Sequence, residues 1–168
     1  MDNTIYTKRW LEADWQLFKT IRLEALSKHD NFFGSSLESE SSKEDSFWKN
    51  TLVDTNRLAI FGLYDEDKVI GMKAIFRDWN GREGVAVLVM SYIREEYRGK
   101  GLSDLLYKAS IDWAKAQGDI RILTVGHREG NVASRSAILR QGFTLTEVKD
   151  QLYGNGETDT DYIYQLKI

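Results

Sequence analysis

The sequence contains no cysteine and no proline among its 168 residues. Without cysteine, a disulfide scaffold, a thiolate zinc site and a cysteine nucleophile are all excluded. Average proline usage of about 5% would give roughly eight prolines in a chain of this length. Their absence excludes collagen-like segments, polyproline II helices and proline-rich linkers.

Targeting and membrane-spanning patterns are also missing. Residues 1–4 show no basic region leading into an apolar stretch, as a signal peptide would. No run approaches the roughly 20 apolar residues of a transmembrane helix. The formal net charge is −3 and the pI is about 5.5, the opposite of the bias typical of duplex-binding domains. We therefore expect a soluble, cytoplasmic protein with neither a nucleic-acid nor a membrane partner.

Several motifs of metal and nucleotide sites are absent. The two histidines form no His-Glu-x-x-His motif, and Asp159 and Asp161 lack EF-hand spacing, so we expect no metal and interpret both aspartates as part of a polar hairpin loop. The Walker A sequence is missing, and a Rossmann fingerprint would need a third glycine where this chain has Asp104.

What is present is a hydrophobic content of 42%, which is enough for one globular domain over residues 1–168.

We interpret the acidic run 38–45 as a solvated loop and the start of a helix, with Ser41 and Glu44 as a capping box. The alternative is that this run attracts a cationic substrate electrostatically. Apolar spacing predicts strands at 5–10, 57–64, 68–77, 84–93, 120–125, 143–153 and 162–167, and helices at 12–28, 41–53, 102–117 and 132–141. This order indicates an α/β fold with a mixed sheet.

The strongest local signal lies between the most apolar strand, 84–93, and the most clearly amphipathic helix, 102–117. Residues 98–103 read Arg-Gly-Lys-Gly-Leu-Ser. A strand that enters a helix through a glycine-rich turn presents free amides and the positive end of the helix dipole to an anion. The loop thus predicts a phosphate-binding site, and the alternative is a plain glycine turn with surface charge.

A second segment supports the first. Asn131 precedes the predicted helix 132–141, which ends in Gly142-Phe143. Taken together, the two segments resemble the Gcn5-related N-acetyltransferase (GNAT) family, whose first motif is matched by Arg98, Gly101 and loosely Ser103. The resemblance implies a single-domain GNAT fold, with a twisted, mostly antiparallel mixed sheet whose central parallel strands splay apart between flanking helices.

The resemblance also implies a cofactor, acetyl-CoA, and the residues that hold it. The amides of Arg98, Gly99, Lys100, Gly101, Leu102 and Ser103 would cradle the pyrophosphate. The backbone of Ile93 would meet the pantetheine arm and donate to the oxyanion. Asn131 and Ser134 would bind the arm from the other side. Arg140 would reach a phosphate, or alternatively would only face the dipole of its own helix.

The chain departs from the family at the general acid, because Ile138 stands where many relatives carry a tyrosine. Tyr92 and Ser134 are our candidates to replace it, although an aromatic at 92 also suits a strand. The general base is unassigned. We place His127 just beyond a strand end, where it either takes a proton or serves as a loop histidine with backbone hydrogen bonds.

For the acceptor side the resemblance points to the N-terminal helices and the last hairpin, and so to Arg22, Phe33, Trp48 and the loop 153–161, with Trp79 as a further candidate. We expect transfer of an acetyl group to a primary amine of a small molecule or peptide, by direct attack in a ternary complex. One alternative is a catalytically weak or inactive acyl-CoA sensor, and another is a nucleotide-binding regulator. Relatives often form homodimers, so a second copy of the chain is a candidate partner.

Overall fold

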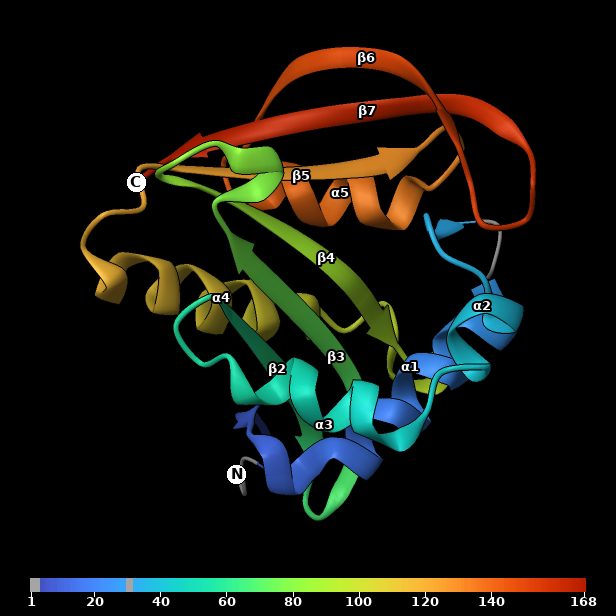
Figure 1. Cartoon of the computed structure of the whole chain (residues 1–168). Coiled ribbons are helices and arrows are strands. Elements are labelled where there is room, and N and C mark those ends of the chain that lie inside the picture. Colours follow the sequence, from blue (N-terminus) through green and yellow to red (C-terminus); the bar gives the residue numbers. More distant parts are fainter. Residues whose placement is uncertain (1–3, 30–31) are drawn as a thin grey trace.

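The computed structural model describes residues 4–29 and 32–168. One twisted sheet of seven strands runs through the protein in the order β1-β2-β3-β4-β5-β7-β6 (Figure 1). The strands are β1 (Ile5–Trp10), β2 (Leu58–Asp65), β3 (Lys68–Arg77), β4 (Val85–Ile93), β5 (Ile122–Arg128), β6 (Thr144–Leu152) and β7 (Thr158–Lys167). The helices are α1 (Trp15–His29), α2 (Leu37–Ser41), α3 (Asp45–Val53), α4 (Ser103–Gln117) and α5 (Val132–Arg140). The predicted α/β fold with a mixed, mostly antiparallel sheet is confirmed.

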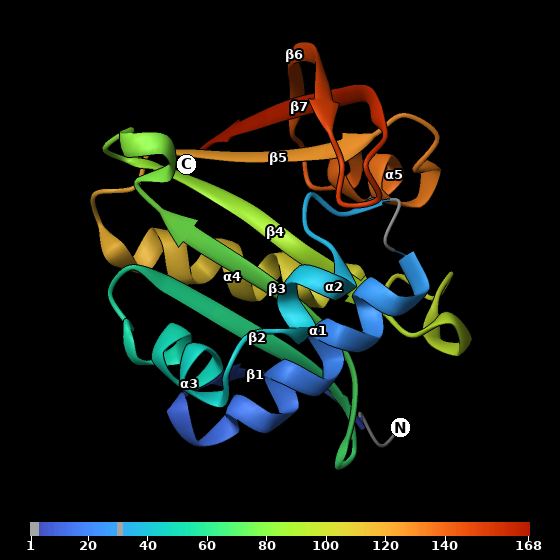
Figure 2. The same ribbon diagram turned by 45° about the vertical axis from the view of Figure 1, so that its right-hand side comes forward.

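The helices cover both faces of the sheet, with α1, α2 and α3 on one and α4 and α5 on the other (Figure 2). The protein has a hydrophobic core on each face of the sheet. Because side chains alternate along a strand, β2 contributes residues to both cores. Its residues Phe61 and Leu63 belong to the core under α4, whereas Leu58 and Ile60 belong to the core under α1 and α3. In the described residues, no helix is long and apolar enough to span a bilayer.

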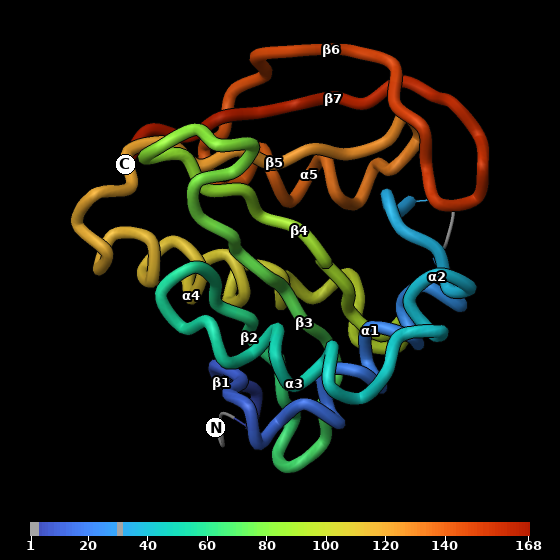
Figure 3. The backbone as a smooth tube through the Cα atoms, in the orientation of Figure 1, coloured from blue at the N-terminus to red at the C-terminus, as the bar shows by residue number. Residues whose placement is uncertain are grey.

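The predicted splay is present where β4 meets β5, which is the parallel pair of the sheet. Their ladder joins residues 85–88 to residues 122–125 and then stops. Past this point the two strands diverge toward their C-terminal ends (Figure 3). A bulge in β4 accompanies the divergence: the register with β3 shifts opposite Lys73, and Met90 adopts a φ of 56°. Backbone groups of residues 89–93 and 126–128 therefore face each other across a gap.

Two local predictions are wrong. The acidic run does not begin as a solvated loop: its first part lies in the short helix α2, which is capped by Ser36 instead of a Ser41–Glu44 box. The N-cap of α3 is Glu44, without a side-chain cap. At the other end of the chain, β7 starts at Thr158, so Asp159 and Asp161 are strand residues and not loop residues.

Candidate functional site

A cavity of about 780 Å³ passes through the gap between β4 and β5. We call it the splay cleft and define it by residues 88–93 of β4 and 124–128 of β5, which line its middle. On one face it reaches the start of α4 and the inner side of α5. On the other face it reaches the end of α1, Phe33 and the hairpin of β6 and β7. The cleft thus connects the two faces of the sheet.

The glycine-rich loop forms the first end of the splay cleft. Gly99 and Gly101 both have a φ of 73°, a conformation that only glycine adopts without strain. A Cβ built on either residue meets nothing within 4 Å, so the backbone lies open at both positions. The loop leads into α4, a helix of 15 residues, whose dipole adds partial positive charge at this point.

The charged side chains of the loop, Arg98 and Lys100, contact neighbouring protein groups. Arg98 donates from Nε to the carbonyl oxygen of Ile93 at 2.7 Å, and its Nη2 lies 2.7 Å from His29 Nε2. Because a guanidinium only donates, this nitrogen of His29 is an acceptor, and burial and the charge of Arg98 lower the pKa of His29. Lys100 lies with its ammonium 5.5 Å from the Tyr97 ring centroid. It does not line the cleft, in contrast to Gly99, Gly101 and Ser103.

Helix α5 brings its two ends to the cleft. At its start, Asn131 accepts at Oδ1 from the amide of Ser134 at 3.2 Å and so caps the helix. At its end, Arg140 turns toward α4 and donates to Ser103 Oγ at 3.1 Å and to Asp104 Oδ1 at 3.2 Å. Of the two alternatives for Arg140, the one toward the phosphate loop fits this position, since its guanidinium lies at the first turn of α4.

Tyr92 belongs to a network that leads away from the gap. Its hydroxyl donates to Glu24 Oε2 on α1 at 2.8 Å, and Arg94 binds the same carboxylate through Nε and Nη2. Burial and the hydrogen bond to Glu24 raise the pKa of Tyr92. The hydroxyl proton of Tyr92 is thus held in the hydrogen bond to Glu24. At the position of the usual tyrosine, Ile138 is buried in the core.

The expected location of His127 is wrong, because the residue lies within β5 and is buried. Its Nδ1 is 3.0 Å from the carbonyl oxygen of Arg128, and its Nε2 is 3.0 Å from the Tyr164 hydroxyl. A carbonyl only accepts, so Nδ1 carries a hydrogen, and in a neutral ring Nε2 then accepts from the tyrosine hydroxyl. The ring also stacks on Tyr162 at 5.2 Å between centroids. Both nitrogens are therefore occupied.

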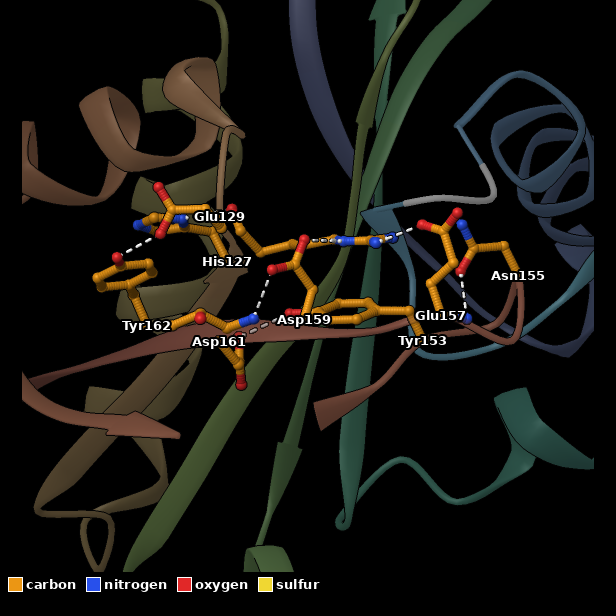
Figure 4. Close-up of polar contacts among 10 residues, drawn as sticks. His127, Glu129, Tyr153, Asn155, Glu157, Asp159, Asp161 and Tyr162 are labelled. Carbon is orange, nitrogen blue, oxygen red and sulfur yellow. Dashed lines mark hydrogen bonds and ion pairs between the residues drawn. The ribbon is translucent and has the colours of Figure 1, made fainter. Parts of the chain in front are cut away.

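At its second end the cleft is lined by Arg128, Tyr153 and Asp161, which belong to a polar cluster (Figure 4). The sequence pointed to the loop 153–161 for the acceptor side, but it did not reveal Arg128. Arg128 pairs with Glu157 and Asp159 at 2.6 and 3.0 Å. Asp161 is only 8% exposed and accepts from the Tyr153 hydroxyl at 3.1 Å. Burial raises the pKa of Asp161. Asp161 fell within the loop 153–161 that the sequence suggested for the acceptor side, but a buried carboxylate on a strand was not predicted, because strands disfavour aspartate.

The structure places the three residues proposed for the acceptor side, Arg22, Phe33 and Trp48, in different environments. Phe33 lines the cleft. Arg22 does not: it is buried, donates to Glu40 at 2.8 Å and stacks on Phe33 with 5.1 Å to the ring centroid. The prediction that Trp48 borders an acceptor pocket is wrong, because its side chain is 1% exposed in the core and packs edge-on against Phe18. Burial removes its large apolar ring from water, although its Nε1 has no hydrogen-bond partner among the described residues. Trp79, by contrast, lines the cleft.

One further group in the cleft was missed. Lys73, in the middle of β3, is 1% exposed, and its ammonium lies 3.2 Å from Ser91 Oγ and 4.0 Å from the Tyr107 ring centroid. The signal for it in the sequence was a lysine interrupting the apolar run 69–76.

Comparisons with known proteins agree with this geometry. A model of the Acetyltransferase (GNAT) family matches residues 15–143. The chain is 36% identical over 75 residues to L-methionine sulfoximine/L-methionine sulfone acetyltransferases of Pseudomonas aeruginosa and Pseudomonas paraeruginosa. This match covers 44% of the chain and less than half, 43%, of those relatives.

Solved structures share the fold. A GNAT-family acetyltransferase from Streptococcus pneumoniae has a TM-score of 0.78 at 19% identity, over 98% of this chain and 99% of that one. A putative acetyltransferase from Salmonella typhimurium, solved with its cofactor acetyl-CoA, has a TM-score of 0.76 at 19% identity, over 98% of this chain and 94% of that one.

Proposed function

Because this chain belongs to the GNAT family of acetyltransferases, we propose that it transfers the acetyl group of acetyl-CoA to a primary amine of a small molecule or peptide. The observation that carries the proposal is the splay cleft, which runs from an anion-binding loop, through the gap in the sheet, to a buried carboxylate. Such a passage lets a cofactor enter from one face and an acceptor from the other. We propose direct attack in a ternary complex, and the absence of cysteine excludes an acyl-cysteine intermediate.

The residues of the loop fit the pyrophosphate of acetyl-CoA. Open amides at Gly99 and Gly101 and the dipole of α4 favour an anion there, and the guanidinium of Arg140, which pairs with Asp104, lies beside them. The pantetheine arm carries amides, and the unpaired backbone of residues 89–93 can bind them as a sheet edge binds an added strand. The amide nitrogen of Asn131 and the hydroxyl of Ser134 would contact the arm from α5. When bound, acetyl-CoA supplies the acyl group as a reactive thioester.

We assign the general base to Asp161. An amine attacks only when it is neutral, so its ammonium form must lose a proton in the cleft. Asp161 is a buried carboxylate whose raised pKa makes it a better base than an exposed aspartate, and Tyr153 fixes its orientation. The backbone N–H of Ile93 is our candidate donor to the oxygen that becomes negative. His127 instead supports β5 through its two hydrogen bonds.

A second candidate function is an acyl-CoA-binding sensor without catalysis. It is favoured by Ile138, which leaves α5 without the hydroxyl of the usual tyrosine. Release of free thiol from acetyl-CoA in the presence of an amine panel separates the two functions. The panel begins with L-methionine sulfoximine and L-methionine sulfone, for which two relatives are named. Thiol release above the hydrolysis background supports the enzyme, and its absence with every amine supports the sensor.

Isothermal titration with CoA tests the cofactor site. We expect micromolar binding that Gly101→Glu abolishes, because the new side chain places bulk and negative charge in the anion site and strains a residue with positive φ. The matched control is Gly156→Glu, which makes the same change at a glycine with a φ of 84° and open space, outside the cleft. Absence of CoA binding by the wild type would contradict the proposal.

A further inference from the structure

Lys73 is a buried cation that none of the roles above uses. Within the described residues no ion pair joins it to a carboxylate, and its ammonium donates instead to the hydroxyl of Ser91. Burying a lysine without a counter-charge is costly, because the charged form loses its hydration. A well-packed apolar residue would serve β3 better if the position had only a structural role.

The surroundings of Lys73 allow two protonation states near neutral pH. Opposite it, β2 places the apolar Phe61, β4 places Ser91, and α4 places the ring of Tyr107. Tyr107 is the titratable group that faces it, and burial keeps this phenol protonated by raising its pKa. Burial likewise lowers the pKa of Lys73 to about 7. The ring face of Tyr107 favours the ammonium and opposes a larger decrease.

Ser91 connects this buried amine to the splay cleft. It follows Met90 in the bulge of β4, it is exposed, and it lines the cleft together with Lys73 and Tyr107. Since Lys73 Nζ donates to Ser91 Oγ, the hydroxyl hydrogen of serine is free to point elsewhere. A proton can therefore pass from Lys73 Nζ to Ser91 Oγ, and from Ser91 Oγ into the splay cleft.

We propose that Lys73 and Ser91 form a proton relay that protonates the sulfur of CoA as it leaves. This inference rests on the proposed acetyl transfer. The amine nitrogen forms the new C–N bond, the C–S bond breaks with its electron pair going to sulfur, Ser91 Oγ gives its proton to sulfur, and Lys73 Nζ gives a proton to Oγ. Lys73 is left neutral, and solvent protonates it again before the next turnover. Lys73 acts through Ser91 and is therefore a positioning residue.

Other hydroxyls at the site are less suited to this step. The proton of Tyr92 is held by Glu24 on α1, and Ile138 has none to give. Ser134 lines the cleft, but among the described contacts none joins its hydroxyl to a titratable side chain. Ser91 is backed by a group that titrates near neutral pH.

Two variants and a control test the relay. Lys73→Met removes the charge with similar side-chain length, and Ser91→Ala breaks the path at an exposed residue without altering the core. Lys108→Met is the control, because Lys108 is an exposed lysine of α4 that pairs only with Asp112 among the described contacts. The first readout needs no turnover: the ultraviolet absorbance of the thiolate is followed while enzyme-bound CoA is titrated with base.

We expect the thiol of CoA bound to wild type to titrate at lower pH than the thiol of CoA bound to Lys73→Met, since the protonated fraction of Lys73 stabilises the thiolate. In Lys73→Met the titration returns to that of free CoA. In steady-state kinetics, kcat falls about 100-fold in Lys73→Met and about 10-fold or more in Ser91→Ala, while KM for acetyl-CoA changes less than about threefold. The inflection of kcat near pH 7 disappears in Lys73→Met and persists in the control.

The outcomes separate this inference from the proposed function. Wild-type protein that binds no CoA overturns both. Normal CoA binding together with an unchanged thiol titration and an unchanged pH profile in Lys73→Met overturns the relay alone. If Lys73→Met does not fold, an unchanged kcat in Ser91→Ala overturns the relay, because this exposed substitution leaves the core intact.

Discussion

The carboxylate of Asp161 lies against Gly126 of β5, where a Cβ would stand 3.1 and 3.4 Å from its two oxygens. Glycine at this position therefore lets a buried carboxylate approach the strand beside the splay. The Tyr153 hydroxyl holds the same group from the other side at 3.1 Å. Asp161 thus places a carboxylate at one end of the splay cleft, and the glycine-rich loop 98–103 lies at the other end.

Asp161→Asn should lower kcat/KM for acetylation about 100-fold, because the amide cannot accept the amine proton. Wild-type activity should rise with pH through the raised pKa of Asp161, and this limb should be missing in the variant. Initial rates from pH 4 to 9 check it. Asp112→Asn, an exposed change on α4, is the control. Equal pH profiles for wild type and Asp161→Asn would contradict the assignment.

Glu40→Gln should destabilise the protein by about 3–5 kcal/mol, because it leaves the buried guanidinium of Arg22 without its counter-charge. Urea unfolding measures the difference. Glu38→Gln, an exposed change on the same helix α2, should alter stability by less than about 0.5 kcal/mol. The double variant Arg22→Met with Glu40→Gln should recover most of the loss, and no recovery would show that the charge is not the cause.

Lys73→Met should stabilise the protein near pH 7, by up to about 4 kcal/mol, since each pKa unit corresponds to about 1.4 kcal/mol. The pKa of Lys73 is about 7 in the folded state and higher in the unfolded chain. Between these values the unfolded state binds more protons, so wild-type stability rises with pH. The advantage of the variant should therefore shrink from pH 7 to pH 10. A constant advantage in thermal unfolding would contradict a depressed pKa.

Glu24→Gln should remove a stabilisation that is fully present above the unfolded pKa of glutamate and is lost at lower pH. Hydrogen bonds from Arg94, and then from Tyr92, lower the pKa of Glu24 in the folded protein. A carboxylate with a lowered pKa stabilises at neutral pH, and this contribution is lost as pH falls through the folded pKa. We expect a loss of about 1 kcal/mol at pH 7 that fades towards pH 3. Thermal unfolding across this range is the measurement, with Glu38→Gln as the flat control.

The sequence predicted the local geometry of the glycine-rich loop and of the start of α5 better than the positions of the residues proposed for the acceptor side. Glycines at 99 and 101 and the cap at Asn131 act locally, within a turn or at a helix end, so their pattern can be read along the chain. Trp48 and Arg22 could not be placed in this way. An aromatic ring and a guanidinium suit either a core or a pocket, and only the packing of α1 against α3 and the pairing with Glu40 decided between them.

By itself, the sequence determined the order of elements, the mixed sheet and the glycine turn before α4, because apolar periodicity and turn chemistry are short-range properties. Only the tertiary structure decided which charges enter the splay cleft. Lys73, Ser91 and Asp161 come from β3, β4 and β7, far apart in the chain, and the bulge and the register of the sheet bring them to one passage. Burial then lowers the pKa of Lys73 and raises that of Asp161, and burial is a property of the folded molecule and not of any local pattern.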